Sequence, residues 1–230
     1  VIGAFDHGIY GAVERVSDHL IMPAAGKPRQ ILWRIYAAKT ILAAGATERP
    51  IAFENNDRPG IMLASAMRSY ANRWAATPAQ RVTIFTNNDD GHRTAADLHA
   101  KGVKIVAVID SRADAPRSLD YEVVQGAQVV DSKGRLGVKF VEVKLADGSS
   151  RTIECGALGV SGGWNPNVHM TCHQRGRPTW NESLAAFVPG GTLPPGMTVT
   201  GAANGDLSTH MALKTGAAAA KAALGLKGRS

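Results

Sequence analysis

The stretch Val82–Arg112 reads VTIFTNNDDGHRTAADLHAKGVKIVAVIDSR and decides the fold. It contains an apolar, β-branched run, a polar turn ending at Gly91, a small-residue helix, and a second apolar run ending at Asp110. This order is typical of the βαβ unit that opens a dinucleotide-binding domain. In such a unit the turn carries Gly-x-Gly-x-x-Gly, whereas here the three positions hold Thr86, Asn88 and Gly91.

The lost glycines have a physical consequence. The first glycine of the fingerprint permits a tight turn, and the second lets the backbone approach the pyrophosphate. The Asn88 side chain fills that place, and Asp89 and Asp90 add negative charge where a helix N-terminus would otherwise attract an anion. Asn88 or Asp89 can instead cap the helix, and Gly91 is retained for close packing of helix on strand. We therefore expect a dinucleotide fold that has lost its dinucleotide; the alternative is that Asp110 binds a ribose hydroxyl.

The composition is that of an ordinary globular protein. The chain has 230 residues, 44% of them hydrophobic and 20% charged, which is enough for one large domain or two small ones. The net charge is +7, but Lys and Arg are spread along the whole chain. A solvated surface or a face for an acidic partner subunit is therefore expected, and nucleic-acid binding is not. No apolar run reaches the roughly 18 residues of a membrane span. Cys155 and Cys172 provide no disulfide framework, which predicts a cytoplasmic location.

Outside the opening unit, buried strands and helices are interrupted by antiparallel meanders. Helices are expected at 64–76, where Pro78 ends the helix, and at 209–224. The apolar patterning predicts strands at 8–16, 30–36, 39–44, 127–130, 136–145, 152–160 and 197–203. Together these elements indicate an α/β fold with doubly wound, Rossmann-type sheets and β-meanders in three layers. In such sheets the ligand lies beyond the carboxyl ends of the strands.

The first candidate site is the turn Gly45-Ala46-Thr47, which follows a buried strand. Small residues at a strand end let a ligand lie against the backbone. The alternative is a simple tight connection before Pro50. The residues themselves do not decide between the two.

The second candidate is the turn at Gly205 and Asp206, which follows the last strand. The Asp206 carboxylate can accept hydrogen bonds from ribose hydroxyls, and the N-terminus of the next helix can face a pyrophosphate. The alternative is an N-cap, in which Asp206 or Ser208 starts the helix.

A metal site and a catalytic site find little support. His169, Cys172 and His173 lie close in sequence, but a structural zinc site needs four ligands, and Cys155 would have to supply the last. Packing and surface roles are expected for these residues. No base is aimed at Cys172, and no Gly-x-Ser-x-Gly motif is present, so we expect neither a metal nor a catalytic residue.

Several strand-end motifs carry a family resemblance. LAAGATERP, GVSGGWNPN and TVTGAANGD resemble the turns of two-dinucleotide-domain flavoproteins of the thioredoxin-reductase-like group. Within that group, three longer stretches resemble the α subunit of heterotetrameric sarcosine oxidase. They are AAGATERPIAFENNDRPGIMLASA (43–66), TIFTNNDDGHRTAADL (83–98) and GVSGGWNPNVHMTCHQRGRPTW (159–180). The run TNNDDGHRTAADL is the most specific of these motifs.

The resemblance implies a domain organisation. Residues 1–62 and 165–230 would form parts of a first FAD/NAD(P)-binding-like domain, and 63–164 an inserted, degenerate second dinucleotide-fold domain. The N-terminal βαβ unit of the first domain, with the family's phosphate-binding loop, would precede Val1. We therefore expect this chain alone to bind NAD weakly or not at all.

The resemblance also implies a function. NAD would be bound by this subunit, near Gly45–Thr47 and Gly205–Asp206, while FMN lies at a subunit junction. Sarcosine would be demethylated to glycine at a flavin and FAD site in a partner subunit of the same hetero-oligomer. Trp164 or Trp180 is expected at a subunit interface. Two alternatives stay open: a subunit of a related amine or opine dehydrogenase, and a cofactor-free structural docking module.

Overall fold

The computed structural model describes residues 1–226, and the chain forms two compact units. The first unit is Val1–Thr47 with the chain from Asn165 onward, and the second is Glu48–Trp164. Residues 48–62, expected in the first domain, group with the second unit. The reason is visible in the hydrogen bonds: the Glu54 N–H donates to the Val130 carbonyl at 3.0 Å. Residues 227–230, part of the predicted first domain, lie outside the described residues.

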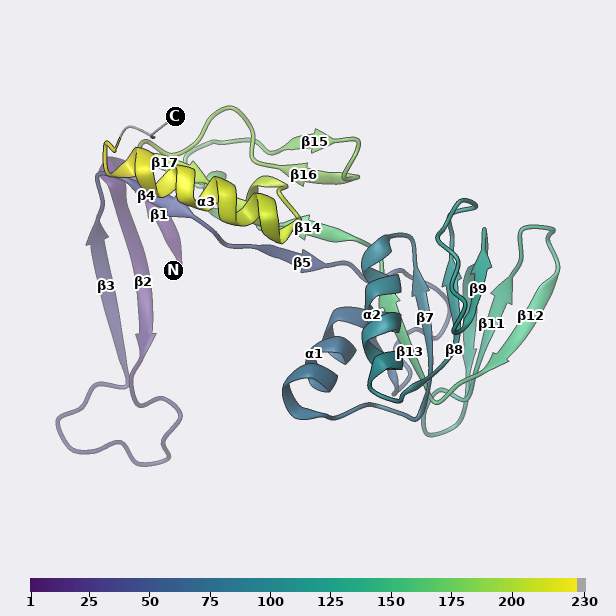
Figure 1. Ribbon diagram of the computed structural model, residues 1–230. Coiled ribbons are helices and arrows are strands. Elements are labelled where there is room, and N and C mark those ends of the chain that lie inside the picture. Colours follow the sequence, from purple (N-terminus) through teal and green to yellow (C-terminus); the bar gives the residue numbers. More distant parts are fainter. Residues whose placement is uncertain (227–230) are drawn as a thin grey trace. The chain divides into compact units, whose positions relative to one another are not determined.

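The second unit is built on a five-stranded sheet in the order β6-β13-β7-β8-β9 (Figure 1). Every pairing in it is parallel. The strands are β6 (Ile61–Leu63), β7 (Arg81–Thr86), β8 (Lys104–Asp110), β9 (Glu122–Gln125) and β13 (Ala157–Ser161). A parallel sheet has to be covered on both faces, and here the two covers differ.

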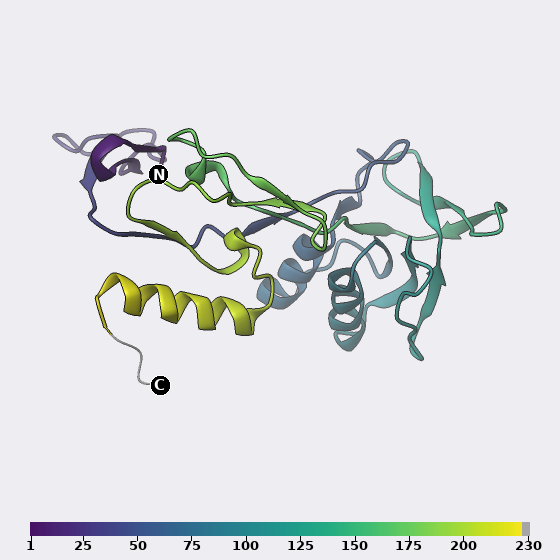
Figure 2. The same cartoon turned by 90° about the horizontal axis from the view of Figure 1, so that it is seen from above.

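Two helices cover one face of this sheet. They are α1 (Ala64–Trp74) and α2 (Asp89–Ala100), and Figure 2 shows them side by side. Their buried side chains, including Met67 and Leu98, pack against β-branched residues of the sheet such as Ile84. The β7–α2–β8 segment is the βαβ unit expected from the sequence.

An antiparallel three-stranded sheet covers the other face. Its strands are β10 (Gln128–Lys133), β11 (Phe140–Lys144) and β12 (Ser150–Glu154). Val141, Val143 and Ile153 from this sheet pack against Phe85 and Ile109 of the parallel sheet. The predicted three-layer, Rossmann-type α/β fold is therefore confirmed, with a β-meander in place of the second helical layer.

The first unit combines a meander with a short parallel pair of strands. β1 (Gly3–Phe5), β2 (Ile9–Arg15) and β3 (Gln30–Tyr36) form an antiparallel sheet, with the 3₁₀ turn η1 (Asp6–Gly8) between the first two strands. β4 (Thr40–Leu42) pairs in parallel with β17 (Met197–Val199). A small core of Ala4, Tyr10, Met197, Val199 and Ala203 joins the two sheets.

The remaining elements of the first unit follow its strand ends. β15 (Thr179–Asn181) and β16 (Ala186–Val188) form a hairpin, and α3 (Thr209–Ala223) follows the 3₁₀ turn η3 (Gly201–Asn204). A further turn, η2 (His169–Thr171), precedes the hairpin. The chain passes between the units through β5 (Ala46–Glu48) and β14 (Trp164–Pro166).

Three sequence predictions are corrected by the structure. The single strand expected at 152–160 is two strands, because the Cys155 N–H donates to Lys139 and the Gly156 N–H donates to Arg81. The chain thus moves from the antiparallel to the parallel sheet at this dipeptide. The strand expected at 197–203 ends at Val199, since Gly201 has a φ of +64° and starts a 3₁₀ turn. The GVSGGWNPN motif, which the resemblance assigns to a turn, contains a short strand, β14.

Candidate functional site

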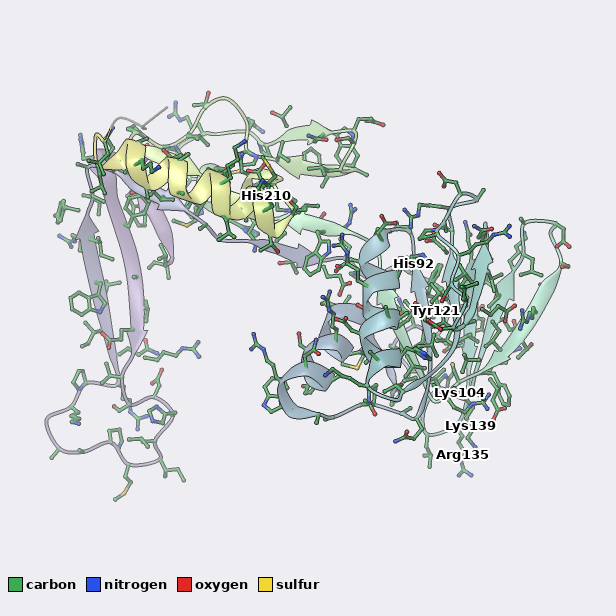
Figure 3. The ribbon with its side chains drawn as sticks, viewed as in Figure 1. His92, Lys104, Tyr121, Arg135, Lys139 and His210 are labelled. Carbon is green, nitrogen blue, oxygen red and sulfur yellow. The ribbon has the colours of Figure 1, made fainter. Side chains whose placement is uncertain are left out.

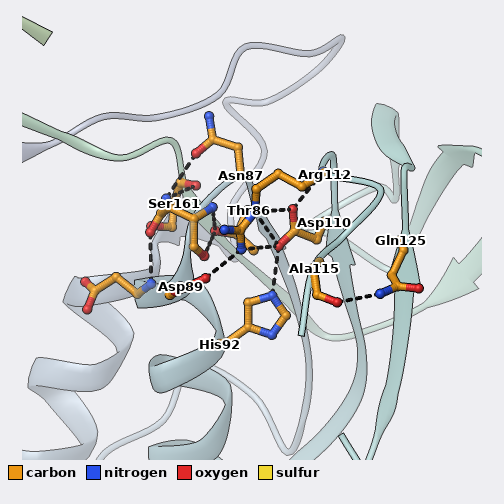
Figure 4. Close-up of polar contacts among 11 residues, drawn as sticks. Thr86, Asn87, Asp89, His92, Asp110, Arg112, Ala115, Gln125 and Ser161 are labelled. Atoms are coloured by element: carbon orange, nitrogen blue, oxygen red, sulfur yellow. Dashed lines mark hydrogen bonds and ion pairs between the residues drawn. The ribbon is translucent and has the colours of Figure 1, made fainter. Parts of the chain in front are cut away.

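The turn after β7 is filled by its own side chains (Figure 4). The Asn88 Oδ1 atom accepts the Asp90 N–H at 3.0 Å and so caps α2. The Asn88 Nδ2 atom donates to the Ser161 carbonyl at 3.0 Å. Thr86 Oγ1 accepts the Asn88 N–H at 3.1 Å and donates to the Asn88 carbonyl at 2.9 Å. The predicted cap is confirmed, and the N–H groups of Asn88 and Asp90 are already paired.

Gly91 has the role expected from the fingerprint. A Cβ atom at this position would lie 2.4 Å from Oγ1 and 2.5 Å from Cβ of Thr86. No ordinary side chain fits at such distances. The last glycine of the motif is thus required for helix–strand packing, independently of any nucleotide.

Asp110 at the end of β8 is held by residues of its own unit. Its side chain is 0% exposed, and Oδ2 lies 2.8 Å from His92 Nε2 and 2.8 Å from Arg112 Nη2. The Arg112 N–H donates to Oδ1 at 2.9 Å, and the Arg112 guanidinium also reaches Asp89 at 2.9 Å. Burial raises the pKa of Asp110, but the hydrogen bonds from His92 and Arg112 outweigh it and lower the pKa to about 2. Both oxygens are engaged, which disfavours the alternative of a ribose hydroxyl on Asp110.

The Gly45 turn in the first unit is open. Gly45 has a φ of +72°, and a Cβ atom there would meet nothing within 4 Å. Asn167 braces the turn: its N–H donates to the Gly45 carbonyl at 3.0 Å, and Nδ2 donates to the Ala44 carbonyl at 2.9 Å. Thr47 Oγ1 donates to Asn167 Oδ1 at 3.1 Å. Glycine is needed for the backbone angle, and space remains beside it.

The turn at Gly205 and Asp206 is packed but leaves one carboxylate oxygen without a partner among the described residues. Gly205 has a φ of +89°, and the Asp206 N–H donates to the Gly201 carbonyl at 3.1 Å. Ser208 caps α3 by accepting the Met211 N–H at 3.2 Å, so Asp206 is not the N-cap. Within residues 1–226, Asp206 Oδ2 is buried and has no hydrogen-bond partner. A buried acceptor without a partner costs free energy, and a ligand hydroxyl would satisfy it.

The two turns of the first unit lie at the same sheet edge. Leu42 of β4 is in register with Val199 of β17, and the Thr200 N–H donates to the Leu42 carbonyl at 3.0 Å. The chain after each strand leaves by the carboxyl edge, where a ligand of such a sheet lies. The predicted site residues of 45–47 and 205–206 therefore follow strands that end at the same edge of this sheet. Asn167 was not among the predicted site residues, although it lies in the GVSGGWNPN motif that carries the resemblance.

The metal and membrane alternatives gain no support. In the part of the chain that the structure describes, no three His, Cys, Asp or Glu side chains are grouped to hold a metal ion. His173 instead accepts the Ala4 N–H through Nδ1 at 3.1 Å. Burial raises the pKa of the Cys155 thiol, which disfavours the thiolate. None of the described helices is long and apolar enough to cross a membrane.

Solved structures of known proteins share this fold. Lactococcus lactis thioredoxin reductase matches with a TM-score of 0.63 and 15% identity, over 85% of this chain and 67% of that one. L-proline dehydrogenase from P. horikoshii matches with a TM-score of 0.59 and 19% identity, over 86% and 37%. A FAD-dependent pyridine nucleotide-disulphide oxidoreductase from Desulfovibrio vulgaris matches with 0.57 and 14%, over 90% and 58%. The fold is that of the thioredoxin-reductase-like flavoproteins.

The sequence comparison is more specific. The chain is 42% identical to the sarcosine oxidase subunit alpha of Rhizobium meliloti (strain 1021) over 224 residues, 96% of this chain and 22% of that one. It is 38% identical to the subunit alpha of Corynebacterium sp. (strain P-1) over 237 residues, 97% of this chain and 24% of that one. No protein-family model matches. The resemblance to sarcosine oxidase α subunits is confirmed over nearly the whole chain, which spans under a quarter of these relatives' length.

Proposed function

We propose that this chain is the NAD-associated portion of a sarcosine-oxidase-type α subunit. The complex would demethylate sarcosine oxidatively to glycine, with the catalytic flavin and FAD in a partner subunit and FMN at a subunit junction. This chain would supply no catalytic residue. Its similarity to sarcosine oxidase α subunits over 96% of its length supports the assignment of the complex.

The observation that carries the NAD assignment is the free oxygen of Asp206. This carboxylate follows the last strand, is not used as the helix cap, and keeps a buried, unpaired acceptor. A ribose hydroxyl is a donor of the right kind for it. Gly45, Ala46 and Thr47 lie beyond the neighbouring strand β4, and Gly45 has open space beside it.

NAD binding by the complete subunit tests this assignment. Asp206→Asn keeps the size of the side chain but removes its charge, and we expect NAD affinity to fall about tenfold. Asp6→Asn, on the η1 turn of the same unit, serves as the control and should leave the affinity unchanged. Equilibrium dialysis gives both values. An unchanged affinity in Asp206→Asn would contradict the NAD role of this turn.

A basic surface of the second unit supports a role in a hetero-oligomer. Figure 3 shows Lys104, Arg135 and Lys139 at one end of that unit. Lys104 is in register with Arg81, and the Arg81 carbonyl accepts the Gly156 N–H. The Lys139 carbonyl accepts the N–H of the preceding residue, Cys155. Lys104, Arg135 and Lys139 form no ion pair with any described residue. Such a surface suits an acidic face of a partner subunit.

Assembly with the partner subunits tests this surface. Replacing Lys104, Arg135 and Lys139 with Glu should weaken association and reduce its dependence on salt, as measured by sedimentation at several ionic strengths. The control reverses Lys214 and Lys221 on α3. If assembly is the same in both variants at every salt concentration, these charges serve solubility only.

For the second unit alone, a cofactor-free docking role is favoured. The Asn88 turn has its polar groups paired internally, and Asp110 is saturated by His92 and Arg112. Titration of the complete subunit with NAD should therefore leave the signals of Asn88 and Asp110 unchanged in a nuclear magnetic resonance spectrum.

A further inference from the structure

The outer strand of the meander in the first unit, β3, is an apolar edge. The strand order is β1-β2-β3, so β3 pairs with β2 on one side and with no described strand on the other (Figure 1). It reads QILWRIY, and six of its seven residues are exposed. A long apolar edge in water is a template for pairing with another strand, and native proteins cover or charge such edges.

The meander of the second unit shows the composition of an edge strand that faces water. Its outer strand β12 reads SRTIE, in which the one apolar residue, Ile153, is buried in the core. The Arg151 side chain of β12 forms an ion pair with Glu122 at the surface. By contrast, β3 carries four exposed large apolar side chains, which are Leu32, Trp33, Ile35 and Tyr36. The sequence of β3 therefore suits a strand that is covered.

The outer half of the β2–β3 hairpin has no third strand beside it. β1 pairs only with residues 9–11 of β2, so residues 12–15 and 30–33 form a two-stranded ribbon. A two-stranded hairpin is only marginally stable in water, and a third strand stabilises it. The free side of β3 is where such a strand can be added.

Every second residue of β3 turns its backbone N–H and C=O groups outward. The Ala37 N–H donates to the Gly8 carbonyl at 2.9 Å, and the Val16 N–H donates to the Arg29 carbonyl at 3.0 Å. Because bonded residues alternate in an antiparallel ladder, β3 bonds to β2 through residues 31, 33 and 35. The backbone groups of the other four residues point away from β2, and no described residue pairs with them. These outward residues are Gln30, Leu32, Arg34 and Tyr36.

The side chains of the outward residues share one face of the sheet, since successive side chains of a strand alternate. Leu32 and Arg34 line an apolar groove of about 320 Å³ on this face, together with Phe5 and Ile9. Tyr10, the next residue of β2, belongs to the core of the first unit. The groove therefore faces away from that core.

Arg34 determines which charge an added strand should carry. It is the only charged residue among those lining the groove, and it forms no ion pair with any described residue. Side chains directly opposite each other on paired strands are in contact, and opposite charges there are stabilising. An added strand should thus place Asp or Glu opposite Arg34 and apolar residues opposite Leu32 and Tyr36.

A second copy of this chain fits the edge poorly. If two β3 strands pair so that all four outward residues meet, each Arg34 lies opposite Leu32 of the other copy, and no carboxylate is present. A shift of two residues places the two Arg34 side chains opposite each other, where like charges repel. Each copy also carries a net charge of +7. The missing carboxylate has to come from a different sequence.

We propose that β3 is a docking edge for an extended segment of a partner subunit, which adds a fourth strand to the meander. The segment pairs with the outward N–H and C=O groups of β3 and places an Asp or Glu opposite Arg34, between two apolar residues at alternate positions. Backbone hydrogen bonds supply the affinity, and the side-chain pattern supplies the specificity. This docking site deepens the proposed function, because its partner is another subunit of the same complex.

Hydrogen exchange of the complete subunit, alone and bound to its partner subunits, tests the edge directly. In the free subunit we expect the amides of residues 30, 32, 34 and 36 to exchange fast, because they have no acceptor. In the complex these amides should exchange at least about tenfold more slowly, because the added strand accepts their hydrogen bonds.

Substitutions test the chemistry of the edge. Leu32→Pro removes one outward N–H, a change that an edge strand tolerates, and Arg34→Glu sets like charges opposite each other. Each variant should weaken association with the partner subunits about tenfold, as measured by sedimentation. Arg34→Lys keeps the charge and should associate nearly as well as the parent. Leu213→Ser, at an exposed leucine of α3, is the control and should leave association unchanged.

Several outcomes would overturn this docking site. Fast exchange of the outward amides in the complex would show that no strand is added. Slow exchange in the free subunit would assign the strand to the subunit's own chain, and exchange that slows with subunit concentration would assign it to a second copy. Unchanged association in Arg34→Glu, which leaves the backbone intact, would reject an acidic partner even if Leu32→Pro disturbs the hairpin.

The same measurements separate this docking site from the proposed function. A complex that assembles and oxidises sarcosine while residues 30–36 still exchange fast would leave the proposed function standing and reject only the docking site. If the complete subunit assembles with no partner subunit at all, both fail.

Discussion

In both units β-strands end in turns of the same kind, but the turns differ in whether their polar groups are paired. In the second unit the turn after β7 is closed by Asn88, and Asp110 at the end of the next strand is fully buried and bonded to His92 and Arg112. In the first unit Gly45 has open space beside it, and Asp206 keeps an unpaired oxygen. The turn of the second unit has satisfied its polar groups internally, whereas the turn at Asp206 leaves one buried acceptor without a partner among the described residues.

This difference distinguishes a turn that is closed by its own side chains from turns that leave open space or an unpaired acceptor. Gly91 shows that part of the fingerprint serves packing alone, since Thr86 leaves no room for a Cβ there. At the two fingerprint positions that serve the pyrophosphate, Thr86 and Asn88 stand in place of glycine. At the position that serves helix packing, glycine is retained as Gly91. A site that is closed should be costly to mutate, whereas an open site should tolerate mutation and lose only its ligand.

The largest effect is expected at the two strand-end carboxylates. Asp110→Asn removes the charge that pairs with Arg112 and His92, and we expect it to lower the free energy of unfolding by about 3 kcal/mol. Asp206→Asn should have no measurable cost, because the oxygen that it replaces has no partner among the described residues. Urea denaturation of both variants gives the comparison. Equal losses would show that the Asp206 turn is as closed as the other.

The cost of Asp110→Asn should depend on pH. The folded pKa of Asp110 is lowered from 3.8 to about 2, so its ionised form stabilises the fold above about pH 4. That contribution is lost as the pH falls through the folded pKa. The difference in unfolding free energy between parent and variant should therefore be constant near neutrality and shrink between pH 4 and pH 2. A difference that stays the same at pH 2 would argue against this pairing.

Substitution of a glycine should also destabilise the fold more in the second unit than in the first. The difference in unfolding free energy should be smaller than for the two carboxylates. Gly91→Ala forces a methyl group against Thr86, and we expect a loss of about 2 kcal/mol from overpacking. Gly45→Ala meets no neighbour and should cost only the strain of a positive φ, about 1 kcal/mol. Gly148→Ala, which also has a positive φ and open space, is the matched control for that strain. Thermal unfolding measures all three, and a Gly45→Ala loss as large as that of Gly91→Ala would mean that the first turn is tightly packed.

Much of the fold was predictable because it depends on local patterning. The run 82–112 specified β7, α2 and β8, and its Asn88 cap was expected from residue type alone. The break at Cys155 and Gly156 was not predictable, since an apolar run reads the same whether it serves one sheet or two. β9 was missed for a related reason: it pairs along the edge of β8, a long-range contact that no local signal encodes.

The candidate site was predictable in type but not in detail. The rule that ligands lie beyond strand ends pointed to Gly45 and Gly205. The bracing role of Asn167 could not be read, because its partners Ala44 and Thr47 are more than a hundred residues away in sequence. Likewise, the choice between Asp206 and Ser208 as helix cap depends on side-chain geometry, which the structure assigns to Ser208.

The smallest effect concerns the closed turn itself. Replacing Thr86 and Asn88 with Gly, and Asp89 and Asp90 with Ala, restores the fingerprint but removes the cap on α2. We expect the variant to be about 1 kcal/mol less stable than the parent, from the lost cap and the added backbone freedom. Nucleotide affinity should hardly rise, because Asp110 would still be held by Arg112 and unavailable to a ribose. Calorimetric titration with NAD and FAD measures the gain, and the parent should bind neither at this turn. A dinucleotide whose phosphates lie against residues 88–91 of the unmodified protein would show that this turn is open. The two units would then differ in which ligand they bind, and not in whether their turns are closed.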